Sequence, residues 1–215
     1  GPPQVYPSGV NRLYHQSHRI ADRTIDLIRE SDPEKPFFAF CSFVDPHHPF
    51  DPPEPYASMY DPDKLEPPPY TEGELEDKPP HFMKARTARG FSNEKYDYRR
   101  LTPHDWGRVK AAYYGMITLI DDNIGRILQA LEEKGIEDDT LVLFTSDHGE
   151  LLGDHGLLFQ GPFHYDSLIK APMNIKWPGV LPKGSRHSQV AAHDDTPPHP
   201  PAHAPRPPHY RRQTA

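Results

Sequence analysis

The sequence lacks several features that define large classes of protein. It holds one cysteine in 215 residues, which excludes an intramolecular disulfide and any zinc module built from several cysteines. Its apolar runs are far shorter than the ~20 residues that a transmembrane helix requires, so we expect no membrane segment. The formal net charge is -7 and there is no basic stripe, so we expect no nucleic-acid partner.

Proline is abundant instead, with 28 residues, and it divides the chain into segments. Residues 1–17 contain turn formers without a period, which predicts an irregular N-terminal segment. Residues 51–102 are rich in proline, and pairs such as Pro79–Pro80 predict a long loop without regular structure. The aromatic side chains of this loop favour a segment that packs over the substrate side. Residues 191–215 hold prolines, histidines and arginines, which predicts a disordered tail, either native or produced by a reading-frame error.

The part between the irregular N-terminus and the tail, residues 18–190, carries clear helix and strand patterns. The predicted helices are 18–30 and 103–134, and the predicted strands are 37–44, 140–145 and, more weakly, 173–177. Thr102 is the predicted N-cap of the long helix. A strand, a long crossover helix and a second strand are typical of parallel α/β units. The sequence therefore predicts an α/β domain with a mostly parallel sheet flanked by helices, incomplete in this chain.

Side chains of metal-ligand type follow two of the predicted strands. Asp45, His47 and His48 come after the first strand, and Asp147 and His148 come after the second. Ligands bind beyond the carboxyl ends of strands in open α/β sheets, so we expect the two groups to meet at one edge. This arrangement favours a metal-assisted site over two unrelated loops.

Three motifs in this order resemble the sulfatase family of the alkaline-phosphatase-like superfamily. They are Pro-His-His-Pro-Phe at 46–50, Ser-Asp-His-Gly-Glu at 146–150 and Ala-Pro-Met-Asn-Ile-Lys-Trp-Pro-Gly at 171–179. The resemblance covers about residues 18–190. It implies an alkaline-phosphatase-like fold and metal-dependent hydrolysis of a sulfuric ester, the substrate being a small-molecule or saccharide sulfate ester.

The resemblance also implies roles for particular residues. Asp147 and His148 match the pair that holds a divalent cation, usually Ca²⁺; Mn²⁺ is the alternative, because it accepts an imidazole ligand more readily. His47 matches the histidine that contacts the sulfate ester, where an imidazole can stabilise the leaving oxygen. Gln160 stands where the family has a sulfate-binding lysine, and His164 lies in a segment that can reach the same crevice.

The sequence departs from the family pattern at the nucleophile. The family makes a formylglycine from a cysteine or serine in a C-x-[PA]-x-R string, whereas Cys41 is followed by Ser-Phe-Val-Asp. We therefore assign no nucleophile, and expect a fragment without the N-terminal part of the family and with weak or no turnover. Three alternatives remain: a phosphonate monoester or phosphodiester hydrolase of the same superfamily, a non-catalytic truncated product, and a histidine-rich tail on an unrelated α/β scaffold.

Overall fold

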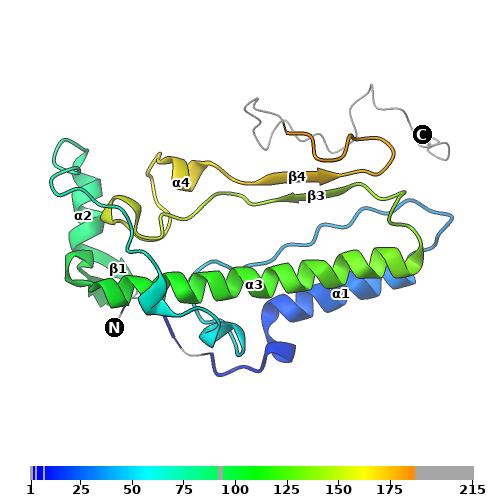
Figure 1. The fold of residues 1–215 in the computed structure, drawn as a ribbon, viewed down its shortest axis with the longest axis horizontal. Coiled ribbons are helices and arrows are strands. Elements are labelled where there is room, and N and C mark those ends of the chain that lie inside the picture. Colours follow the sequence, from blue (N-terminus) through cyan, green and yellow to red (C-terminus); the bar gives the residue numbers. More distant parts are fainter. Residues whose placement is uncertain (1, 3, 7, 92–93, 187–215) are drawn as a thin grey trace.

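The computed structural model describes residues 2, 4–6, 8–91 and 94–186. Its helices are α1 (Gln16–Glu30), α2 (Pro80–Ala88), α3 (Pro103–Lys134) and α4 (Asp166–Ile169), and its strands are β1 (Arg89–Phe91), β2 (Glu94–Tyr96), β3 (Val142–Thr145) and β4 (Met173–Lys176). Figure 1 shows an elongated arrangement in which α1 and the β3–β4 hairpin lie on opposite sides of α3. The predicted tail at 191–215 lies outside the described residues. None of the described helices combines the length and the apolar character needed to cross a membrane.

The long helix α3 confirms the sequence prediction at both ends. The Thr102 hydroxyl accepts the Asp105 backbone N–H at 3.1 Å, and the Asp105 carboxylate accepts the Thr102 N–H at 3.0 Å, which forms a capping box. Pro103 occupies the first helical position, where no backbone donor is needed. Gly135 ends the helix with a φ of 72°, a left-handed conformation that favours glycine.

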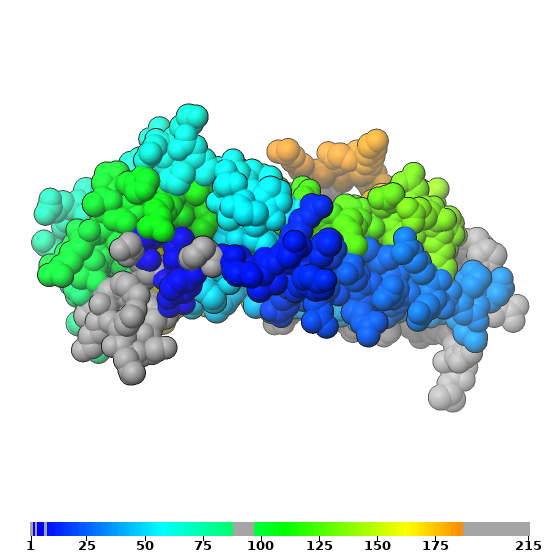
Figure 2. Space-filling model, turned by 90° about the horizontal axis from the view of Figure 1, so that it is seen from below, coloured from blue at the N-terminus to red at the C-terminus, as the bar shows by residue number. Residues whose placement is uncertain are grey.

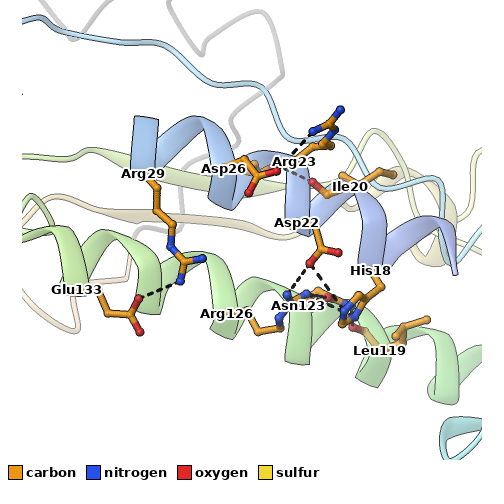
Figure 3. A network of polar contacts seen from close by, with 11 residues as sticks. His18, Ile20, Asp22, Arg23, Asp26, Arg29, Leu119, Asn123, Arg126 and Glu133 are labelled. Carbon is orange, nitrogen blue, oxygen red and sulfur yellow. Dashed lines mark hydrogen bonds and ion pairs between the residues drawn. The ribbon is translucent and has the colours of Figure 1, made fainter. Parts of the chain in front are cut away.

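Helix α1 packs along the second half of α3. Ile25 and Ile28 of α1 are buried against Ala130 and Leu131 of α3. Polar pairs flank this apolar contact, as Figure 3 shows: Arg126 donates to Asp22 and to Asn123, and Arg29 pairs with Glu133 at 3.2 Å. Residues 22 and 29 of α1 thus meet residues 126 and 133 of α3 in the same order, so the two helices run parallel.

His18 lies at this interface and makes the stability of the α1–α3 pair dependent on pH. Burial lowers the pKa of His18, and the nearby Arg126 lowers it further; Asp22 opposes the shift and Arg12 adds to it. The unfolded chain therefore takes up the proton first as the pH falls through about 6.5, and the free energy of unfolding decreases. We expect His18→Gln to remove part of this decrease, measured by urea denaturation at pH 8 and pH 5.5. An unchanged pH dependence would contradict the assignment.

The parallel sheet predicted from the sequence is wrong for the described chain. β3 pairs with β4 antiparallel, with Val142 opposite Lys176 and Thr145 opposite Met173. Residues 37–44 form no strand, although Figure 1 shows them running beside α3 in the same direction as β3. A strand needs a neighbour to satisfy its backbone groups, and the structure places none against this run among the described residues. Phe38 and Phe40 are each 83% exposed as a result.

The proline-rich segment is more ordered than the sequence predicted. It contains α2, the hairpin β1–β2 and the 3₁₀ turns Tyr56–Ser58, Pro62–Lys64 and Tyr98–Arg100. The prediction of no regular structure fails at Pro80 because a proline in the first turn of a helix loses no backbone hydrogen bond.

The aromatic residues of this segment pack against α3. Tyr56 and Tyr98 are buried, and Figure 2 shows the cyan part of the segment lying next to α1 on one face of the molecule. Glycines allow the close approach, because a Cβ on Gly107 or Gly115 of α3 would collide with the carbonyl of Pro62 or Tyr56.

Candidate functional site

The loop that carries His47 is held by the main core. His47 donates its backbone N–H to the Val44 carbonyl at 3.1 Å, which closes a turn after the extended run. Three residues later Phe50 is fully buried, with its ring 5.6 Å from that of Phe159 and edge-on to that of Tyr113 at 5.7 Å. The buried Phe50 ring anchors the loop, so the His47 imidazole can be exposed while the loop backbone stays in place.

The Asp147–His148 pair lies in the turn that follows β3. Gly149 donates its N–H to the Leu168 carbonyl at 2.7 Å, and a Cβ at this position would collide with the Ser167 carbonyl. Only glycine fits this approach, which turns the chain sharply after the strand. The Asp147 side chain is 87% exposed, and the His148 Nε2 lies 3.8 Å from its carboxylate.

The loop that carries His47 and His48 contacts residues 159 and 160. The Gln160 side-chain nitrogen lies 2.9 Å from the His47 Nε2, although the two residues are 113 positions apart. The His48 ring packs on the Phe159 ring with centroids 4.4 Å apart. The structure therefore brings His47 and Gln160 into direct contact, as expected for two groups of one site.

Glu150 is a further candidate that the sequence analysis did not single out. Its carboxylate accepts the Leu152 N–H at 3.2 Å and is also bonded by the amides of Leu151 and Phe159. Burial raises the pKa of Glu150, while these amides and the nearby His148 act in the opposite direction. Glu150 thus ties the turn after β3 to the segment that carries Gln160. The available signal was an acid directly before Leu151 and Leu152, where an unpaired charge is costly if the segment is buried.

The hydrogen bonds of His47 define its tautomer. Its Nδ1 lies 2.6 Å from the His48 carbonyl, which can only accept, so Nδ1 carries the proton. In the neutral imidazole Nε2 is then an acceptor, and it matches the amide N–H of Gln160. A protonated His47 would donate from both nitrogens, so the ring can either accept or supply a proton at Nε2.

Three further sequence candidates lie apart from this contact. His164 is exposed, and among the described residues no hydrogen bond or ion pair joins it to His47 or to Asp147. Cys41 accepts a hydrogen bond from Thr24 of α1 at 3.2 Å, which agrees with a packing role. Asp45, grouped with His47 in the sequence, turns to α1 and accepts from Ser17.

Asp147 and His148 suit a divalent cation as part of a coordination shell. The His148 Nδ1 is engaged with the Gly149 carbonyl at 2.7 Å, so Nε2 faces the Asp147 carboxylate. One carboxylate and one imidazole on the same turn are usual donors for such ions. Within the described ranges no group of three or more histidine, cysteine, aspartate and glutamate side chains could hold a metal. The pair could therefore supply two ligands of a larger set.

Known proteins are similar to this chain over most of its length. A family model described as Sulfatase matches residues 2–203. The arylsulfatase of Clostridium perfringens (strain 13 / Type A) is 39% identical over 181 residues, which are 84% of this chain and 36% of that protein. The multifunctional alkaline phosphatase superfamily protein PehA of Trinickia caryophylli is 33% identical over 79% of this chain and 34% of its own length.

A solved structure agrees with these relatives. The phosphonate monoester hydrolase of Agrobacterium radiobacter superposes with a TM-score of 0.71 and 33% identity, over 80% of this chain and 35% of that one. The similarity supports an alkaline-phosphatase-like fold, of which the described residues form a part with several helices and two small two-stranded sheets. The chain spans about a third of the length of the relatives that it matches.

Proposed function

The chain belongs to the sulfatase family, and on this basis we propose that it forms one side of the active site of a metal-dependent sulfuric ester hydrolase. The observation that carries the proposal is the 2.9 Å contact between His47, in the motif at 46–50, and Gln160, which lies 113 positions later. The family is generally dependent on a divalent metal. The nucleophile is assigned to a part of the family fold that the described residues do not include.

The residues of this chain would divide the work between the leaving oxygen and the sulfate group. A protonated His47 donates from Nε2 to the ester oxygen as its bond to sulfur breaks. Gln160 donates a neutral amide hydrogen bond to a sulfate oxygen. Asp147 and His148 would hold the divalent cation, which we assign as Ca²⁺ with Mn²⁺ as the alternative, and which polarises the sulfate oxygens when bound.

The substrate class that we propose is a small-molecule or saccharide sulfate ester. The Clostridium perfringens relative is named an arylsulfatase, which supports the sulfate group. A phosphonate monoester is the second candidate, because a phosphonate monoester hydrolase superposes with a TM-score of 0.71. Both substrates present a singly charged tetrahedral group with one leaving oxygen, so the site geometry accommodates either.

A hybrid enzyme tests this function directly. The segment of the Clostridium perfringens arylsulfatase that aligns with residues 16–186 is replaced by the segment from this chain. We expect the hybrid to hydrolyse 4-nitrophenyl sulfate, with paired assays on an aryl phosphonate ester to rank the two candidates. A hybrid that is folded by circular dichroism and hydrolyses neither ester would contradict the proposal and favour a non-catalytic product.

The hybrid also tests whether Gln160, an uncharged side chain, binds the sulfate group. We expect Gln160→Lys to raise kcat/KM for the aryl sulfate by about tenfold, because a charge-assisted hydrogen bond is roughly twice as strong as a neutral one. Gln160→Met, of similar length and without a donor, is the matched control and is expected to lower kcat/KM. Equal rates for all three side chains would show that residue 160 does not contact the sulfate group.

Metal binding should differ between the hybrid and the 215-residue chain. The ligands that we propose from the described residues are Asp147 and His148, whereas Ca²⁺ prefers six to eight oxygen ligands. We therefore expect calorimetric titration with Ca²⁺ and Mn²⁺ to give tighter binding for the hybrid, and Asp147→Ala to weaken that binding. Identical titrations of the hybrid and of its Asp147→Ala variant would remove Asp147 from the metal site.

A further inference from the structure

The loop that carries His47 is fastened at its start to the first turn of α1. The Asp45 carboxylate accepts a hydrogen bond from the Ser17 hydroxyl and lies 3.6 Å from the His15 Nδ1. The side chains of His15 and Asp45 are each 11% exposed, and Ser17 is buried. A carboxylate at this place also faces the positive end of the helix dipole. Asp45 is therefore held by a hydrogen bond, a nearby imidazole and a helix end.

The far end of the same loop returns to the same place. Asp51 is half-buried, and burial raises the pKa of its carboxyl; His15 opposes the shift and Asp45 adds to it. The charge of His15 at the start of α1 thus acts on the carboxyl groups at both ends of the segment 45–51, and Asp45 is in direct contact with it. Between them Phe50 is locked in the core, with its N–H donated to the Gln4 carbonyl at 2.6 Å.

His47 lies at the tip of this fastened loop. Its own turn begins at Val44, so Asp45 is the second residue of the turn that presents the imidazole. The His47 ring stacks on the His48 ring at 4.1 Å, and its Nδ1 faces the His48 carbonyl. A shift of the turn at Asp45 would move both nitrogens of His47, and with them the contact to Gln160.

We propose that Asp45 is a positioning residue for His47: by binding Ser17 and facing His15 on α1, it fixes the turn that sets the tautomer and the place of the His47 imidazole. The proposal rests on the proposed function insofar as it gives His47 a catalytic role. In this proposal Asp45 binds to α1. The sequence analysis had instead grouped Asp45 with side chains of metal-ligand type.

The test reads the His47 ring in the 215-residue chain by ¹⁵N NMR of the histidine side chains, with the His47 signal identified by its loss in His47→Gln. We expect one dominant tautomer with the proton on Nδ1 in the unchanged chain. Asp45→Ala should lose that dominance, and Asp45→Asn, which still accepts from Ser17, should keep it. The matched control is Asp26→Ala, an exposed acid of α1 that lies 3.5 Å from Arg23 and should leave the signal unchanged.

Stability is measured on the same samples, so that unfolding is not mistaken for mispositioning. If Asp45→Ala does not fold, Ser17→Ala takes its place and is expected to shift the His47 signal in the same direction. A folded Asp45→Ala or Ser17→Ala chain with an unchanged His47 tautomer would overturn the proposal. Because the readout is the ring and not turnover, an inactive hybrid enzyme with an intact His47 signal would reject the proposed function and leave this inference standing.

Discussion

Replacing His47 by alanine in the hybrid enzyme is expected to lower kcat/KM for 4-nitrophenyl sulfate by about 10²–10⁴-fold, the usual contribution of a positioned general acid or base. The structure gives the reason, since the His47 Nε2 is directed at Gln160 and its Nδ1 is already engaged with a carbonyl. The change removes a proton donor without disturbing the core, because the side chain is on the surface.

The matched control is His104→Ala, which removes another exposed imidazole. His104 lies in the first turn of α3 and contacts the Asp63 carboxylate at 2.7 Å, a surface pair of small energetic value. We expect its kcat/KM to stay within about twofold of the unchanged hybrid. Surface substitutions usually change the free energy of unfolding by no more than about 0.5 kcal/mol, so the fold should stay intact. A similar loss in both variants would show that the His47 effect reflects folding and not chemistry.

The sequence was sufficient for the long helix α3 because its signals are local. The capping pair Thr102–Asp105 and the stop at Gly135 act within one turn of α3, so the predicted bounds are the observed ones. The proline-rich segment was harder, because the packing of Tyr56 on α3 depends on the distant Gly115. Local patterns do not report such contacts.

The predicted strands at 140–145 and 173–177 correspond to β3 and β4, whereas the one predicted at 37–44 is absent. The apolar run 37–44 is typical of a buried strand, but a strand exists only beside a partner, and the described residues give it none. The site prediction depended less on the sheet. The family resemblance brought His47 and Gln160 into one hypothesis, and the structure places their side chains in contact. Glu150 was missed because its role depends on amides that only the folded loop presents.

Phe50→Ala is expected to lower the free energy of unfolding of the 215-residue chain by about 3–5 kcal/mol, the range for truncating a buried phenylalanine. Phe50 has no exposed surface, and its ring meets those of Tyr113, Phe159 and His48. The cavity would lie directly beneath the loop that carries His47. Urea denaturation followed by circular dichroism measures the change.

Phe38→Ala is the matched control, since it removes the same side chain from a position that is 83% exposed. We expect it to change the free energy of unfolding by no more than about 0.5 kcal/mol, because little apolar surface is returned to water. Equal losses for the two variants would mean that residues 37–44 are buried in solution. That outcome would restore the strand that the sequence predicted for this run and would revise the packing of the whole face above α3.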